Sequence, residues 1–342
     1  MKINTTLLLL FFFTMTIQLS AQDFSELFKK TNPSVVVIKV IEAESTGTGD
    51  PYEKATFGSL GSGVLINANG SILTAAHVIQ LASDILVEFP DGQALRAQVV
   101  KISNESDIAL IKTMKAPKNP VIAKLADSDK VNVGDQIYII GSPMGLYHSL
   151  SVGHISGRHI EQLDFSRAGK IEFFQTDAAI NTGNSGGPMF NINGEVIGIV
   201  SSILTKSGGF EGLGFVATSN IAKFIMETEG YDWMGVDASY IDGKLAKILN
   251  IKQGAGFLIQ SVAEKSPSYF MGMKGGFQKI IMDEKEILIG GDIMLAANGF
   301  RFNNKKSLAD FLTFFQGMKK GEILKLEILR SGEVINLEWK MK

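Results

Sequence analysis

The chain has 342 residues, 45% of them hydrophobic and 20% charged, with a formal net charge of −2. These proportions are typical of a soluble globular protein, and the charge gives no basic field of the kind that binds nucleic acid. Cysteine is absent, which excludes disulfides, a thiol nucleophile and a lipid-modified cysteine. The length is typical of about two domains at roughly 150 residues each.

The first 21 residues are predicted to be a secretory signal. Lys2 gives a positive start, Leu7 to Phe13 is an unbroken apolar run, and Leu19-Ser20-Ala21 is similar to a small-residue cleavage site. A membrane anchor is the alternative, but the apolar run is short for a bilayer span of about 20 residues. We therefore expect an exported protein with no stable membrane span once the signal is cleaved.

From residue 34 onward the chain is rich in short strand patterns. Residues 34–41 are a β-branched run, and 63–78 has an Asn-Gly turn between two apolar stretches, which predicts a hairpin. Residues 84–100 predict a second hairpin. Further strands are predicted at 107–112, 135–143, 170–178, 188–202 and 212–218. Many short strands at regular spacing favour a β-sandwich or barrel.

The pattern changes after the last of these strands. A helix is predicted from Ser219-Asn220, a good N-cap pair, to about Glu229, and Gly230 and Tyr231 then mark a domain boundary. Strands are predicted around 232–237, 254–262 and 322–339, with a helix at 306–317. We thus expect a signal at 1–21, a β-rich domain at 22–229 and a compact mixed α/β module at 230–342.

One serine lies in an unusual loop, TGNSGGP at 182–188. Such a loop is either an ordinary turn or a device that aims backbone N–H groups at a ligand. A nucleophilic Ser185 would need a base and a group that orients the base. His77 follows an apolar strand and Asp107 opens another. The order His77, Asp107, Ser185 is that of the chymotrypsin group.

The segments LTAAHV, SDIALIK and QTDAAINTGNSGGP resemble the signature blocks of the HtrA/Deg family of trypsin-like serine proteases. YDWMGV (231–236) and GGDIMLAANG (290–299) resemble parts of that family's PDZ domain. The resemblance implies a mainly β fold: a chymotrypsin-like double β-barrel at 22–229, then one small mixed α/β PDZ domain at 230–342. Residues 272–289 are longer than the common PDZ connection, and Thr182 and Ala75 depart from the family's usual residues.

The resemblance assigns four groups of site residues. They are the catalytic His77, Asp107 and Ser185; the oxyanion-hole N–H groups of Gly183 and Ser185; the specificity-pocket residues Ala179, Ile180 and Phe215; and the peptide-carboxylate loop Trp233, Met234, Gly235 and Val236. No cofactor is implied. A metal is not expected, because no acid or cysteine completes a ligand set with His148, His154 and His159.

The function implied is that of an exported serine endopeptidase, in the periplasm or cell envelope or secreted. It would cleave unfolded or misfolded proteins in quality control or stress signalling, and peptide C-termini at the PDZ groove would regulate it. The alternative is a non-proteolytic chaperone or PDZ adaptor with a vestigial protease domain. A homotrimer is also implied. Phe24 and Phe28 would either serve its contact or pack on their own barrel.

Overall fold

The computed structural model describes residues 23–50, 53–142, 148–162, 170–205, 207–228, 233–282 and 285–341. The predicted signal at 1–21 and the predicted domain boundary at 229/230 therefore lie outside the described residues. Within the ranges given, no helix has the length and apolar character needed to cross a bilayer.

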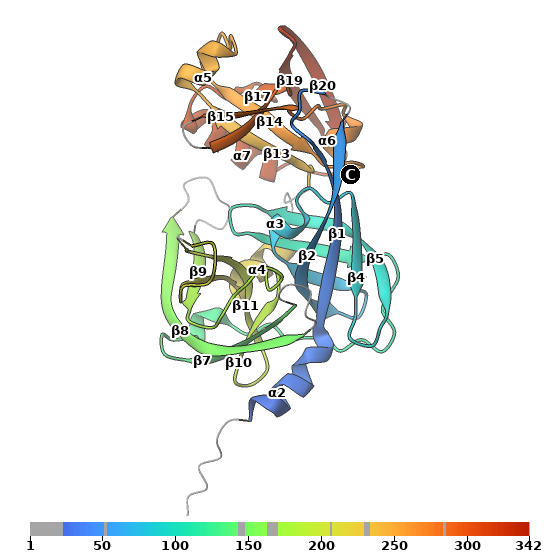
Figure 1. Cartoon of the computed structure of the whole chain (residues 1–342), viewed down its shortest axis with the longest axis vertical. Helices are drawn as coiled ribbons and strands as arrows, with labels where there is room; N and C mark the ends of the chain where they lie inside the picture. Colours follow the sequence, from blue (N-terminus) through green and yellow to red (C-terminus); the bar gives the residue numbers. More distant parts are fainter. Residues whose placement is uncertain are drawn as a thin grey trace, which may run out of the picture.

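Two closed six-stranded barrels make up the larger part of the structure (Figure 1). The first has the strand order β1-β2-β3-β6-β5-β4 and contains β1 (Val35–Ser45), β2 (Lys54–Asn67), β3 (Ser71–Thr74), β4 (Asp84–Glu88), β5 (Ala94–Ser103) and β6 (Ile108–Thr113). The second has the order β10-β11-β12-β9-β8-β7 and contains β7 (Gln136–Gly141), β8 (Ser149–Gln162), β9 (Lys170–Thr176), β10 (Pro188–Asn191), β11 (Val196–Ile203) and β12 (Gly214–Thr218). The mainly β, double-barrel prediction is confirmed.

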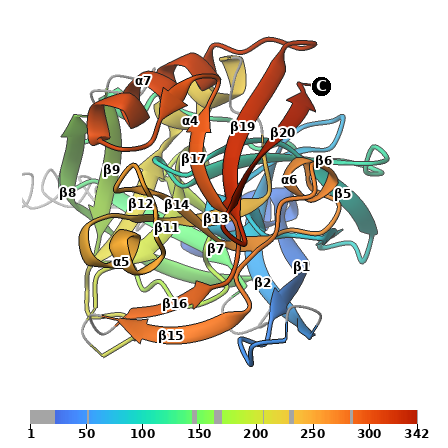
Figure 2. The same ribbon diagram turned by 90° about the horizontal axis from the view of Figure 1, so that it is seen from above.

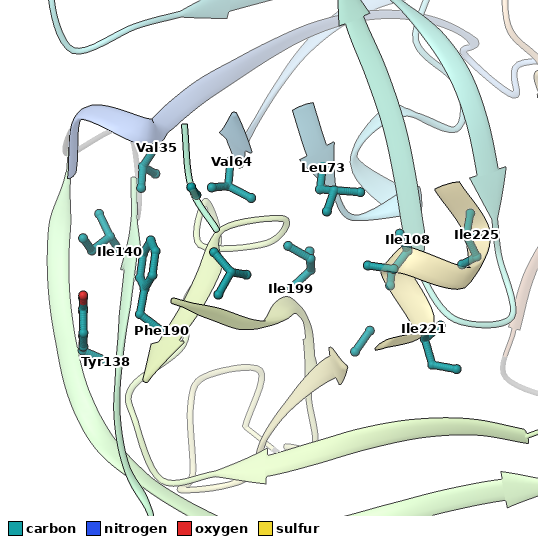
Figure 3. Close-up of a cluster of buried hydrophobic side chains, with 14 residues drawn as sticks. Val35, Val64, Leu73, Ile108, Tyr138, Ile140, Phe190, Ile199, Ile221 and Ile225 are labelled. Atoms are coloured by element: carbon teal, nitrogen blue, oxygen red, sulfur yellow. The ribbon is translucent and has the colours of Figure 1, made fainter. Parts of the chain in front are cut away.

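Three hydrophobic clusters fill and join the barrels. One lies inside the first barrel and a second inside the other. The third lies between them and contains Val64 and Leu73 from the first barrel with Phe190 and Ile199 from the second (Figure 3). Helix α4 (Ser219–Glu227) adds Ile221 and Ile225 to this third cluster. The barrels are therefore fixed against each other by buried side chains, which holds steady any site formed at their junction.

Four short helical segments accompany the barrels besides α4. They are α2 (Phe24–Thr31), η1 (Asn32–Ser34), α3 (Ala76–Ile79) and η2 (Ser128–Lys130). On α2, Phe24 and Phe28 pack against the cluster between the barrels, and the Phe24 ring meets the Tyr138 ring edge-on at 5.7 Å. These two phenylalanines thus pack on their own barrel, which is one of the two alternatives given for them above.

The C-terminal unit is a six-stranded sheet with three helices. Its strand order is β13-β14-β17-β19-β20, with β18 paired to β17 and a separate β15–β16 hairpin. The elements are β13 (Val236–Ile241), α5 (Gly243–Ile248), β14 (Gly256–Val262), α6 (Pro267–Phe270), β15 (Gln278–Met282), β16 (Lys285–Ile289), β17 (Ile293–Ala297), β18 (Phe300–Arg301), α7 (Lys305–Gln316), β19 (Ile323–Arg330) and β20 (Glu333–Lys340). The strand β13 is an edge of the sheet.

The C-terminal unit lies across one end of the two barrels (Figures 1 and 2). The turn between β1 and β2 meets the β15 end of the unit, where the Gly49 N–H donates to the Phe277 carbonyl and the Lys279 N–H donates to the Gly47 carbonyl, both at 3.0 Å. Two ion pairs, Lys265–Asp84 at 2.7 Å and Lys54–Glu264 at 3.2 Å, add to this contact. Exposed pairs of this kind contribute little each, so the backbone pairing is the more specific link.

Candidate active site

His77 lies on α3, in the first barrel, directly after strand β3. The hairpin predicted at 63–78 had His77 at the end of its second strand. The strand instead stops at Thr74, and the Ala76 N–H donates to the Asp107 carbonyl at 3.2 Å as the chain turns into α3. The His77 side chain is about half exposed, with 50% of its surface open. It is thus anchored beside Asp107 and still accessible from solvent.

The Asp107 carboxylate accepts three hydrogen bonds at the start of β6. The donors are His77 Nδ1, at 2.8 Å from Oδ2, the His77 backbone N–H, at 3.0 Å from Oδ1, and the Ser201 hydroxyl, at 2.6 Å from Oδ2. Asp107 has a φ of 52°, in the left-handed region that Asp and Asn adopt more readily than most residues. Because the carboxylate only accepts, Nδ1 carries the proton and Nε2 is left as a base.

Ser201, which the sequence did not single out, is the third group on this carboxylate. It lies on β11 directly after a buried run at 196–200, and it is itself 6% exposed. Buried hydroxyls are almost always hydrogen-bonded, so a serine inside such an apolar run was the available signal. Its bond keeps the Asp107 carboxylate in one orientation toward His77.

The loop that carries Ser185 joins β9 to β10 and docks onto Ser62 of β2. The Ser62 hydroxyl donates to the Gly183 carbonyl at 2.7 Å, and the Ser62 N–H donates to the Ser185 carbonyl at 2.8 Å. At Gly186 φ is 81°, and an added Cβ would lie 2.1 Å from Thr74 Oγ1 and 2.3 Å from the Ser62 carbonyl oxygen. Only glycine fits at that close approach.

The backbone N–H groups of Gly183 and Ser185, on either side of Asn184, are among those of this loop that have no acceptor in the described residues. Gly183 has a φ of 103°, open to glycine and strained for other residues. Paired N–H groups at a nucleophile can stabilise the negative oxygen of a tetrahedral intermediate. The loop therefore supplies the donors that an oxyanion hole needs.

The Ser185 hydroxyl donates to the Ser201 carbonyl over a long 3.5 Å. In the part of the chain that the structure describes, no hydrogen bond joins it to the His77 ring. A serine nucleophile needs its Oγ within about 2.6–3.2 Å of its base, and such bonds are often looser without substrate. The Ser185 hydroxyl is thus bonded to the Ser201 carbonyl, beside an already assembled His–Asp pair.

The predicted pocket residues do not all lie together. Ala179 is exposed in the loop after β9, while Ile180 is 2% exposed and belongs to the core of the second barrel. A Cβ added at Gly214 would lie 2.5 Å from Ile180 Cδ1, so Gly214 faces Ile180. Phe215 is next along β12 and so points to the other side of the sheet, where it meets His159 edge-on at 5.6 Å. The structure therefore groups Gly214, and not Phe215, with Ile180.

The predicted carboxylate loop, Trp233 to Val236, borders a cavity of about 250 Å³. Apolar side chains of α7 form much of its wall, namely Phe311, Leu312 and Phe315. Gly235 has a φ of 65°, and an added Cβ would lie 2.2 Å from Ser266 Cβ, so glycine is required there as well. Beside the loop, burial raises the pKa of the Asp237 carboxyl above its ordinary value.

The three remaining histidines form no metal site within the described ranges, where no group of three or more potential ligands is found. The backbone N–H of His154 donates to Asp177 at 2.6 Å, and the His159 ring is hydrogen-bonded to Gln175 at 2.9 Å. Burial lowers the pKa of His148 below its ordinary value. Each histidine thus has its own separate surroundings.

Comparisons with known proteins point to one family. Residues 61–199 match the family described as "Trypsin-like peptidase domain". The chain is 36% identical over 323 residues to a "Probable periplasmic serine endoprotease DegP-like" of Pseudomonas putida (strain GB-1), and the match covers 92% of this chain and 60% of that protein. The chain thus spans about 60% of the length of that relative.

Solved structures are similar to this chain over both the barrels and the C-terminal unit. The "HtrA-type protease AlgW with tripeptide" matches with a TM-score of 0.52 at 28% identity, covering 93% of this chain and 96% of that one. The same protease "with decapeptide" matches with a TM-score of 0.51 at 27% identity, covering 93% and 97%. Taken with the two barrels and the His77–Asp107 pair beside the Ser185 loop, these likenesses support an HtrA-type, trypsin-like serine protease.

Proposed function

We propose that the protein is a serine endopeptidase of HtrA type that cleaves unfolded or misfolded proteins. The observation that carries the proposal is the His77 ring held through Nδ1 by the Asp107 carboxylate at 2.8 Å, next to a serine loop with two N–H groups lacking an acceptor among the described residues. A vestigial protease domain in a chaperone or adaptor has no need of either feature. The relatives' names, which say periplasmic serine endoprotease, support the same choice and an exported location.

In the proposed reaction Ser185 Oγ attacks the carbonyl carbon of the scissile peptide bond while His77 Nε2 takes the hydroxyl proton. The N–H groups of Gly183 and Ser185 hold the resulting oxyanion, each such donor being worth about 3 to 4 kcal/mol. The C–N bond then breaks, and His77 gives its proton to the leaving amine. Water attacks the acyl-enzyme in the same way, with His77 as base, and releases the acid and Ser185.

The proposed specificity is for small or medium aliphatic residues before the cleaved bond. Ala179, Ile180 and Gly214 offer no carboxylate, and an unpaired buried cation is costly. A mass-spectrometric map of casein fragments should therefore be dominated by cuts after Val, Ala, Ile and Leu. In the variant Ala179→Asp we expect additional cuts after Lys and Arg. A wild-type map dominated by Lys and Arg would contradict this assignment.

We further propose that residues 22–229 are the protease domain and 230–342 a PDZ domain that binds peptide C-termini. The edge strand β13, the loop at 233–236 and helix α7 enclose an apolar groove suited to strand addition and carboxylate capture. A peptide of about ten residues ending in a free valine carboxylate should bind and raise casein cleavage several-fold. Its C-terminal amide should do neither. Equal calorimetric binding of both forms would overturn the carboxylate assignment.

The homotrimer stays a prediction. The packing of α2 on its own barrel leaves the Phe24 and Phe28 side chains partly buried within one chain. Light scattering of the mature protein would give its mass, with a value three times that of one chain expected.

A further inference from the structure

Gln80 connects the groove of the C-terminal unit to the helix that carries His77. It is the C-cap residue of α3 and lies three positions after His77. Its backbone carbonyl accepts a hydrogen bond from the Trp233 indole N–H at 2.8 Å, and its side-chain amide donates to the Val236 carbonyl at 3.2 Å. One residue thus contacts both ends of the predicted carboxylate loop. Figure 1 shows α3 on the side of the first barrel that faces this unit.

The cavity along the groove has a wall from each unit. Beside the groove residues, it is lined by Gln80, Ile102, Asn104 and Glu105 of the first barrel. Asn104 and Glu105 belong to the turn that leads into Asp107, and the Asp107 N–H donates to the Asn104 carbonyl at 3.3 Å. A ligand in this cavity therefore touches segments that lead directly to both His77 and Asp107.

The Gln80 contacts also compete with a bound peptide. Val236 is the first residue of the edge strand β13, and its carbonyl is where Gln80 donates. A peptide that extends the sheet at this edge has to share or displace that contact. Peptide therefore binds an arrangement without the Gln80 contact more tightly, which is the differential affinity that any population shift requires.

We propose that Gln80 is a positioning residue that holds α3 and the carboxylate loop in the resting arrangement, and that peptide binding releases it. The inference rests on the proposed function, because it names how peptide at the groove changes the same active site. We take as the resting arrangement the one in the structure, in which Ser185 Oγ is bonded to the Ser201 carbonyl. The contacts of Gln80 to Trp233 and Val236 are present together with this arrangement of Ser185.

Release of the Gln80 contact and binding of the peptide should favour each other. In Gln80→Ala the side-chain contact to Val236 is lost, so basal cleavage of casein should rise about fivefold, and stimulation by the valine-terminated peptide should shrink by a similar factor. Affinity for the peptide should tighten by that factor as well. Gln80→Glu keeps the size of the side chain but cannot donate at neutral pH, and we expect the same direction of change. Gln98→Ala, an exposed glutamine of β5, is the matched control and should behave as wild type.

A second readout is independent of cleavage. The chain has two tryptophans, Trp233 and Trp339, so a Ser185→Ala, Trp339→Phe protein reports on Trp233 alone. Titration of that protein with the valine-terminated peptide should shift the Trp233 emission, because Trp233 belongs to the loop that lines the groove. Adding Gln80→Ala should lower the Kd of this titration about fivefold, because the side-chain contact that competes with the peptide at Val236 is absent.

These measurements distinguish a failure of the Gln80 inference from a failure of the proposed function. Unchanged basal rate, stimulation and Kd in both Gln80 variants would overturn the inference alone. Absence of casein cleavage by all forms would overturn the proposed protease, while the fluorescence titration would still decide the role of Gln80. A wild-type protein that does not bind the peptide would overturn the groove assignment and the inference with it.

Discussion

Ser185→Ala is expected to abolish cleavage of casein, with kcat reduced on the order of 10⁶-fold, as loss of the nucleophile does in enzymes of this mechanism. Any remaining activity should come from substrate binding and the oxyanion donors. The fold should be retained, since the hydrogen bond that the Ser185 hydroxyl makes within the described residues is a long one of 3.5 Å. Casein proteolysis and the thermal midpoint, measured side by side, check both statements.

The matched control for this change is Ser156→Ala. Ser156 is an exposed serine on β8, so the same hydroxyl is removed from a residue outside the loop. It should leave both kcat and the thermal midpoint as in wild type. Substantial proteolysis by purified Ser185→Ala protein would place the nucleophile at another residue.

Asp107→Asn is expected to lower kcat by about 10⁴-fold, because a neutral amide no longer stabilises the imidazolium or holds the Nδ1-protonated form of His77. The carboxylate receives three donors here, so an Asn side chain, with one oxygen and one NH₂ group, cannot satisfy them all. The backbone should tolerate the change, since Asn adopts the φ of 52° as readily as Asp. Casein kinetics at saturating substrate measure the loss.

Asp91→Asn provides the control for that substitution. Asp91 is an exposed turn residue that accepts from the Gln93 N–H at 3.0 Å, a bond that an Asn oxygen can also accept. Its kcat should equal that of wild type. If Asp107→Asn were to retain more than about a tenth of wild-type kcat, the assignment of Asp107 as the residue that orients His77 would be wrong.

Much of the fold could be predicted because local patterns and tertiary structure agree. The β-branched run at 34–41 lies in β1, and the Asn-Gly turn joins β2 to β3. The helix expected from Ser219 is α4, and that expected at 306–317 is α7. In each case the hydrophobic period of the segment matches the face that it buries. The closure of the strands into two barrels required the family resemblance, because strand spacing alone also allowed a sandwich.

The site was less accessible from the sequence because it depends on contacts between distant segments. Ser62 and Ser201 hold the Ser185 loop and the Asp107 carboxylate. The apolar run before Ser201 indicates that its hydroxyl needs a hydrogen-bond partner, but the local sequence does not show which residue that partner is. Phe215 was assigned to the pocket from the family resemblance, whereas the structure places Gly214 opposite Ile180 and, by strand alternation, Phe215 on the other side of the sheet. The Gln80 contact crosses between units about 150 residues apart, which no periodicity reveals.

The most direct test of the account is covalent labelling with a fluorophosphonate, followed by peptide mapping. The protein is treated in the presence of casein and the valine-terminated peptide, so that the active arrangement is populated, with trypsin as a reagent standard. We expect a single adduct on Ser185 in the wild type, none in Ser185→Ala, and a strongly reduced yield in His77→Ala. An adduct on another residue, or none on Ser185 while the standard is labelled, would contradict the claim that Ser185 is a nucleophile activated by His77.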